Sequence, residues 1–583
     1  MNTMRITNSF VSVAGVAAAL LFIGPPSVCD TLVAAEQPTW HIDDSLYEPA
    51  VSSVNETVNA SDALAPATAG TDSASNCPVC GGSNAECFWC WGAHVKWSDV
   101  PGWLSPLPRP GSFPILPGGP GYYSAADWVC DEWREKRPPG GYAPFALMPT
   151  SLFDADFRYV ESKPFEERTL SEKLKRMHLG DSLLFSTGGQ TWVRFQNEHN
   201  ARLTTFQNDF LLSRVRVFGD LWFADAARIY GEYIWADMFD EELAGAAPDA
   251  DLGDIQNLFL DVNVFEWNDA PVVVRMGRQE LLFGSQRLVS PPDWLNTRRT
   301  FQGVRTFRRG EKWDLDAFWA QFVLPRATEF DQPDANQDFT GVWATYHREK
   351  GEALDFYYLF LNNTNDITRK GIVEAPVEVS TVGSRWAGDE KDFLWDFEGA
   401  VQFGDRGDND MVAGMATAGL GRNLKQCWGK PTGWIYYDFA SGDNDPNHGT
   451  SNTFNQLYPF GHYYLGWADL VGRQNIHDAN THLYFYPTPW TTVWLQYHHF
   501  WLAEARDALY GPGGAAYRRD PTGQAGTDVG SELDFILNFH LSATSDILLA
   551  YCKLWGGDFL KNTSGPDLAS DADAAYFMYQ IKW

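Results

Sequence analysis

The sequence predicts an all-β fold: a large antiparallel transmembrane β-barrel preceded by an irregular N-terminal region. Three observations predict it: an N-terminus typical of exported proteins, repeated segments in which apolar and polar residues alternate, and a last strand that ends on an aromatic residue. Only alternate residues of a barrel strand face lipid, so the slightly negative mean hydropathy is compatible with this fold.

The first residues predict a secretory signal peptide over residues 1–35. Arg5 precedes an apolar run over residues 11–23, and the small residues at 33–35 provide a cleavage site. Cys29 raises a lipoprotein alternative, which the residues before it support poorly. After residue 40 no stretch approaches the roughly 18 consecutive apolar residues of a membrane-spanning helix.

Residues 36–76 are rich in Ala, Ser, Thr and Asp and show no periodicity. Such a stretch cannot bury enough apolar surface to offset the entropy lost on ordering. We expect a low-complexity linker there.

A cysteine- and tryptophan-rich region, with many Pro and Gly residues, follows at 77–180. Its two CxxC pairs are Cys77, Cys80, Cys87 and Cys90. Four thiolates so close together could hold one tetrahedral zinc ion. Export to an oxidising compartment favours two disulfides instead, and redox chemistry is a third reading. The sequence assigns this region no function.

The barrel is expected over residues 181–583. Period-two alternation recurs in residues 228–235, 258–264, 313–317 and 393–403. A soluble β-sandwich would alternate in the same way, but the export signal and the C-terminal strand favour an outer-membrane barrel. About 400 residues at some 20 to 24 per strand and loop give roughly 16 to 20 strands, which leaves an aqueous lumen.

The final strand supports this reading most directly. Phe577, Tyr579, Ile581 and Trp583 alternate with wetter residues, and the tryptophan is the last residue of the chain. We expect this strand to close the barrel.

Arginines concentrate in one window of this acidic chain. The net charge is −31, yet residues 275–309 contain eight arginines, no lysine and two acids. Guanidinium groups stay charged and bind carboxylates bidentately, so they suit an anion path through a pore. The predicted path residues are Arg275, Arg278, Arg287, Arg305, Arg214 and Arg216. Two other readings remain open: pairing with acids of the wall, which would brace the barrel, and binding of lipid phosphates by loop arginines.

Two segments resemble the alginate-export family of outer-membrane porins. The first is residues 275–289 with Trp294, and the second covers residues 441–475, including Ser441-Gly442-Asp443-Asn444-Asp445-Pro446. The motif residues are Gln279, Gly284, Trp294, Asp443, Asp445, His462, Asp469 and Asn475. The resemblance extends loosely over residues 150–583. It implies a single-chain barrel of about 18 strands that passes an anionic polysaccharide.

The acidic stretches predict solvated loops, with divalent cations as an alternative. Acids between residues 237 and 254 are expected in an outer loop. Residues 443–447 resemble the start of a calcium loop, but His448 stands where an EF-hand needs Gly. Weak calcium binding therefore stays an alternative to a simple turn.

No enzyme motif is present: the sequence lacks GxSxG, HExxH and a P-loop. His498 and His499 are neighbours in a predicted strand, so they should point to opposite faces and cannot share a metal. The acidic charge excludes a nucleic-acid binder. We expect no catalytic residues and no cofactor beyond the zinc and calcium alternatives.

These observations predict an outer-membrane channel for export or diffusion of anionic polysaccharide or other anions, in a Gram-negative-type envelope. The expected partners are outer-membrane lipid, the anion and periplasmic export proteins. The alternative is a structural or adhesive envelope protein anchored by a plugged barrel.

Overall fold

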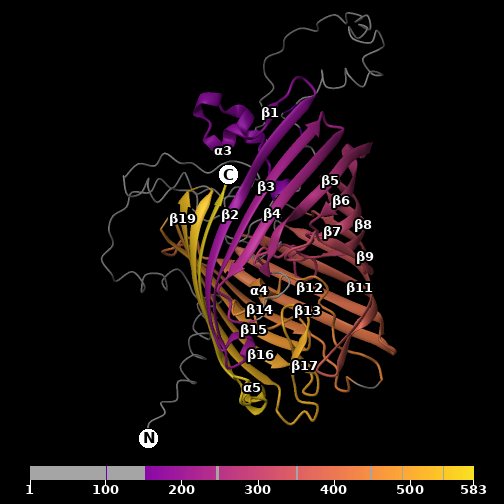
Figure 1. Cartoon of the computed structure of the whole chain (residues 1–583), viewed down its shortest axis with the longest axis vertical. Helices are drawn as coiled ribbons and strands as arrows, with labels where there is room; N and C mark the ends of the chain where they lie inside the picture. Colours follow the sequence, from indigo (N-terminus) through magenta and orange to yellow (C-terminus); the bar gives the residue numbers. More distant parts are fainter. Residues whose placement is uncertain are drawn as a thin grey trace, which may run out of the picture.

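The computed structural model describes residues 97, 100, 151–243, 249–348, 352–446, 449–488, 490–542 and 544–583. One antiparallel sheet dominates it, and eighteen long strands of that sheet close into a barrel (Figure 1). This confirms the predicted fold. The signal peptide, the linker and the four cysteines at 77–90 lie outside the described residues, so those predictions stay predictions.

Each wall strand pairs with its neighbour in sequence, and the last pairs with the first. The wall strands are β2 (Leu183–His199), β3 (Gln207–Phe223), β4 (Ala227–Phe239), β5 (Asp251–Trp267), β6 (Ala270–Gln279), β7 (Phe301–Arg309), β8 (Trp313–Leu324), β9 (Gln332–Tyr346), β10 (Ala353–Arg369), β11 (Ile372–Glu390), β12 (Phe393–Arg406), β13 (Asn409–Asn423), β14 (Thr432–Ala440), β15 (Ile476–Thr488), β16 (Thr491–Leu502), β19 (Asp528–Ser542), β20 (Ser545–Gly556) and β21 (Ala572–Lys582).

Several short elements are not part of the barrel wall. They are β1 (Met177–His178), which pairs with β2, the separate hairpin β17 (Ala508–Tyr510) and β18 (Ala516–Arg519), the helices α3 (Leu170–Lys173), α4 (Gly461–Tyr464) and α5 (Asp558–Asn562), and the 3-10 turns η6 (Leu152–Asp154), η7 (Arg158–Ser162), η8 (Phe165–Glu167) and η9 (Ala201–Leu203). Among the described residues, no helix is both long and apolar enough to cross a membrane.

The C-terminal residue seals the ring. Trp583 N–H donates to the Gly189 carbonyl at 3.0 Å, and Gly189 N–H donates back at 2.9 Å. A Cβ at Gly189 would lie 2.2 Å from the Arg216 carbonyl oxygen, so only glycine admits this approach. The predicted closing strand is thereby confirmed.

The two ends of the barrel differ in their connections. Turns such as 268–269 and 391–392 are short at the end that carries the C-terminus, whereas 280–300, 441–475 and 503–527 are long at the other end. Figure 1 shows α5 and β17 at the end away from the C-terminus. Outer-membrane barrels have short periplasmic turns and longer outer loops, so the chain termini of the barrel mark the periplasmic end.

Each wall strand has one apolar and one polar face. In β4, Arg228, Tyr230 and Glu232 are buried, while Ile229 is 43% and Tyr233 47% exposed. The exposed apolar residues face outward, where lipid would cover them, and the polar residues face the interior.

Candidate functional site

Two long connections fold into the barrel from its outer end. We call residues 280–300 the first inner segment and residues 441–475 the second. Val289 and Tyr458 form a parallel bridge between them. Ser290 N–H donates to the Tyr458 carbonyl at 2.9 Å, and Tyr458 N–H donates to the Leu288 carbonyl at 2.9 Å. The inner segments are therefore one unit, and they overlap the two segments that carry the family motifs.

Apolar side chains hold this unit in the interior. Those from both inner segments pack against inward residues of the wall in one large buried cluster. They include Leu281, Phe283, Leu288, Val289, Trp294, Phe454, Tyr458, Phe460, Tyr463, Tyr464, Leu465, Trp467, Leu470 and Val471. Much of the lumen is thus occupied by the protein itself.

Arg287 ties the first inner segment to the wall. Its Nη2 donates to Asp396 Oδ2 at 2.7 Å and its Nη1 to Glu398 Oε2 at 2.9 Å. Both acids are on the inward face of β12, and Arg385 Nε on β11 donates to Asp396 at 2.8 Å. All four side chains are almost fully buried.

A second cluster fixes the same segment to β3 and β4. Arg214 Nη2 donates to Asp293 Oδ1 at 2.9 Å, and Arg216 Nε donates to Glu232 Oε1 at 2.5 Å. Arg298, from the inner segment, donates to both Glu280 and Asp293. Side-chain exposure in this cluster is 8% or less.

The other three predicted path arginines also contact carboxylates. Asp261 binds Arg275 through two hydrogen bonds of 2.7 and 2.8 Å, and Asp316 binds Arg305 at 2.6 Å. Arg278 lies 3.4 Å from Asp254 and donates to two backbone carbonyls. The pairing is the bracing arrangement that the sequence left open. A role of the six arginines in an anion path stays a prediction.

Arg194 and Arg299 are among the lumenal arginines that have no ion pair with a carboxylate in the described part of the chain. Arg194 Nη1 donates to the Trp294 carbonyl at 2.8 Å, and its guanidinium lies 3.7 Å from the Trp294 ring centre. Arg299 Nη1 donates to the carbonyls of Ser290 and Pro459 at 3.0 and 3.2 Å. Burial lowers the charge screening around both, so each remains a strong local cation.

Motif residues of the first segment have packing roles. Gly284 has a φ of +52°, and a Cβ there would lie 2.5 Å from a ring atom of Trp343. The Trp294 ring stacks on His462 with 3.7 Å between ring centres. Gln279 ends β6 and is buried.

Motif residues of the second segment hold its own turns. Asp443 Oδ1 accepts Asp445 N–H at 2.9 Å, which confirms a turn at this position. His462 Nδ1 lies 3.7 Å from Asp469 Oδ1. Asn475 Nδ2 donates to the carbonyls of Glu504 and Ala508 at 3.1 and 2.9 Å. These contacts explain the motif residues through loop shape.

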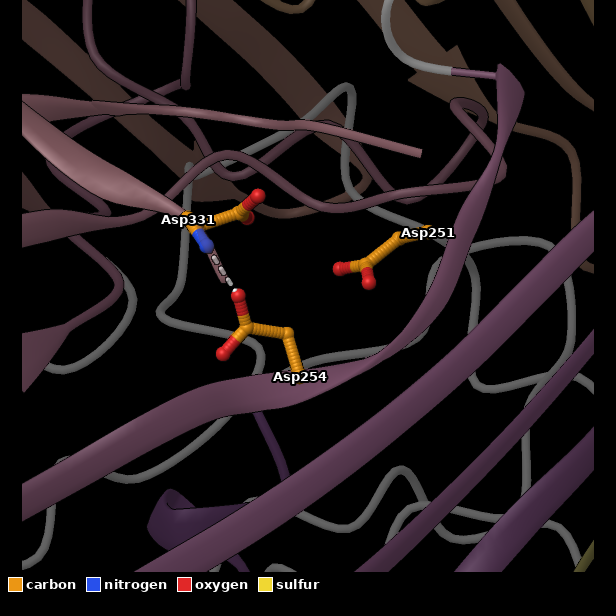
Figure 2. A group of neighbouring side chains, drawn as sticks. All are labelled: Asp251, Asp254 and Asp331. Carbon is orange, nitrogen blue, oxygen red and sulfur yellow. Dashed lines mark hydrogen bonds between the residues drawn. The ribbon is translucent and has the colours of Figure 1, made fainter. Parts of the chain in front are cut away.

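Three carboxylates gather at the outer rim, in a group that we call the rim cluster. Ligand oxygens of Asp251, Asp254 and Asp331 lie within 4.8 Å of one another (Figure 2). Asp254 accepts the Asp331 N–H, and Asp251 accepts the Gly253 N–H at 3.3 Å. The predicted solvated loop is wrong for Asp251 and Asp254, because both are buried in β5. Burial, reinforced by Asp254, raises the pKa of Asp331 to about 6.

Acidic side chains line another part of the interior. Asp478 on β15, and Glu532 and Asp534 on β19, are fully buried on the inward face; we call them the acid wall. Glu532 Oε1 accepts the Ala468 N–H at 2.8 Å, and Asp534 Oδ2 accepts the Trp467 N–H at 3.1 Å. No arginine or lysine of the described chain pairs with these three carboxylates.

The histidine pair separates as predicted. His498 is fully buried, with Nδ1 2.8 Å from Asp478 Oδ2. His499 is partly exposed on the other face, with Nδ1 2.6 Å from Ser531 Oγ. They cannot share a metal ion.

Sequence reasoning missed the acid wall and the carboxylate partners of the arginines. A signal existed: Asp396 and Glu398, like Glu532 and Asp534, are two residues apart and so share one face of a strand. Which arginine meets which acid depends on contacts over a hundred residues apart, as with Arg287 and Asp396.

Sequence over residues 184–571 matches the family described as alginate export. No curated protein matches. The barrel resembles two solved structures from Pseudomonas aeruginosa. OccK3 (OpdO) is 12% identical with a TM-score of 0.46, and the match covers 68% of this chain and 95% of that chain. The outer membrane protein opdK is 11% identical with a TM-score of 0.47, and the match covers 68% of this chain and 99% of that chain. By its sequence over most of the barrel, this chain belongs to the alginate export family of outer-membrane β-barrel channels.

Proposed function

We propose that the channel passes anionic polysaccharide of the alginate type, or smaller anions, by export or diffusion along its lumenal arginines. Family and fold are those of transport channels in the outer membrane. Arg275, Arg278, Arg287, Arg305, Arg214 and Arg216 are the proposed path residues.

The observation that carries the proposal is the pair Arg194 and Arg299. Both guanidiniums are buried among the inner segments and bind only backbone carbonyls and aromatic rings in the described structure. A carboxylate in solution could offer each of them the charged acceptor that the protein does not.

Pairing of the lumenal arginines with wall carboxylates would allow a passing anion to be released. Conduction requires sites that capture an ion weakly enough to let it leave. A wall carboxylate such as Asp261 competes with a passing carboxylate for the same guanidinium, and this competition weakens binding. A row of such pairs would form many weak sites in place of one tight pocket.

Reversal potential in a planar bilayer under a KCl gradient tests the proposal, with and without added polyuronate. We expect anion selectivity and block by polyuronate in the native protein, and a loss of both in Arg194→Gln and Arg299→Gln. Arg348→Gln is the matched control, because its side chain is 62% exposed at a periplasmic turn. Cation selectivity without block would contradict an arginine-guided anion path.

A plugged anchor with a structural or adhesive role is the second candidate. The filled interior favours it, because both inner segments occupy the lumen. An absence of conductance under all bilayer conditions would support the anchor, and a stable open-channel current would remove it.

Metal binding and periplasmic export partners are further proposals. Calcium would find three oxygen donors in the rim cluster, the donor type this ion prefers. The choice between zinc and disulfides at the four cysteines, and contact of residues 77–180 with export partners, await experiments on the full chain.

A further inference from the structure

Residues 151–160, which we call the lumenal segment, lie inside the barrel and are not part of its wall. Phe153, Phe157 and Val160 are buried at 2%, 8% and 0% exposure. The Phe153 ring centre is 5.2 Å from that of Phe259 and 5.7 Å from that of Tyr230. These partners are inward residues of β5 and β4, so the lumenal segment covers the interior face of the wall.

Two wall arginines contact Phe153, one at its carbonyl and one at its ring. Arg228 Nη2 donates to the Phe153 carbonyl at 2.7 Å, and the Arg275 guanidinium lies 4.8 Å from the Phe153 ring centre. Both arginines already bind wall carboxylates, Asp220 and Asp261 respectively. The segment can therefore leave without stranding either arginine, since each keeps its carboxylate.

The lumenal segment meets the first inner segment in the middle of the barrel. Ser151 Oγ donates to Glu280 Oε2, and the same carboxylate binds Arg298. Toward the other end, the chain continues from Val160 to the periplasmic mouth, where β1 pairs with β2. The interior beside β3 to β6 is thus closed from both ends.

An exposed stretch joins the segment to its anchor on the wall. Phe165 is 58% and Leu170 81% exposed, so this stretch adds little packing. The anchor follows: Lys175 Nζ donates to the Thr187 carbonyl at 2.7 Å, and Arg176 N–H to Ser186 Oγ at 2.9 Å. Segments with few buried contacts open at low free-energy cost, so the exposed stretch can serve as a tether.

We propose that residues 151–160 are a displaceable plug that closes the periplasmic side of the lumen beside β3 to β6 and withdraws while the wall stays folded. The plug rests on the proposed function, because a channel is what it would close. Its withdrawal would expose Tyr230, Phe259 and the guanidiniums of Arg228 and Arg275 to the periplasmic opening.

The test measures access to the wall behind the plug in the full chain. Phe259→Cys is a reporter, labelled by a membrane-impermeant maleimide from the periplasmic side. We expect labelling at least tenfold faster when Phe153→Ala and Phe157→Ala are added. Phe165→Ala is the matched control, because it removes the same ring from the tether, and it should leave the rate unchanged. Chains without the reporter give the background from native cysteines.

Equal labelling rates in all three reporter chains would overturn the plug. If the double variant does not fold, the reporter chain with its native plug is labelled in increasing urea instead. A displaceable plug gives labelling while the barrel keeps its folded mobility in unheated gels; labelling only together with barrel unfolding contradicts it. This readout needs no current, so a channel that never conducts would remove the proposed function and leave the labelling result standing.

Discussion

The two charged regions of the interior are built in opposite ways. Around Arg287, two guanidiniums face two carboxylates, and the cluster joins an inner segment to the wall. On the acid wall, Glu532 and Asp534 accept backbone N–H groups of the second inner segment, and no arginine or lysine of the described residues pairs with them. The first region pairs its acids with guanidiniums, including Asp355 with Arg385, whereas the second places its acids next to one histidine. The same task, fastening a loop inside a barrel, is therefore done by ion pairs in one place and by backbone donors in the other.

We expect the largest effect from a substitution in the ion-paired region around Arg287. Arg287→Met should lower the free energy of unfolding by about 3–5 kcal/mol, because it leaves Glu398 buried without a guanidinium and leaves Asp396 with Arg385 alone. Urea titration of the barrel in detergent measures this. Arg348→Met, where a 62% exposed side chain lies 3.6 Å from Glu352, should change stability by about 0–1 kcal/mol. A similar small change in stability for both variants would contradict the larger contribution expected from the buried ion pairs of Arg287.

The rim cluster should make the stability of the barrel depend on pH. Burial, reinforced by Asp254, raises the pKa of Asp331 to about 6, above the usual 3.8. The folded protein therefore binds this proton more tightly than the unfolded chain, and stability should rise as pH falls from about 6 toward 4, by at most about 3 kcal/mol. Urea midpoints across this window measure the slope. Asp331→Asn should flatten it, and an unchanged slope would assign the effect to another group.

We expect the smallest effect on the acid wall, where a substitution should keep or raise stability, in contrast to the loss expected for Arg287→Met. Glu532→Gln keeps an oxygen that can accept the Ala468 N–H and removes a buried acid that has no cation partner in the described chain, so stability should stay equal or rise by about 1 kcal/mol. The same urea titration gives the value. A loss of about 3 kcal/mol or more would show that a cation partner had been overlooked.

The wall could be predicted from sequence, because strand alternation is local. The pattern over residues 393–403 gave β12, and Phe577 to Trp583 gave the closing strand. The residues of the inner segments were found through the family motifs, although nothing in them predicted that they fold inward. Residues 441–475 have no period, and their burial depends on the shape of a barrel that local sequence does not describe. The partner of Arg287 lies 109 residues away in the chain, and only the closed ring brings the two together.

The backbone hydrogen bonds between Trp583 and Gly189 join the last strand to the first, so the barrel is complete only when both strands are in place. Gln190 on the first wall strand binds Gln580 on the last, 390 residues later, so the ring closes only after the whole chain is available. The entropy of closing such a loop grows only with the logarithm of its length, about 5 kcal/mol here before any constant term. Until β2 and β21 meet, the sheet has two unpaired edges, and such edges can pair with other chains. Assembly in the membrane must therefore protect both edges until the first and last wall strands come together.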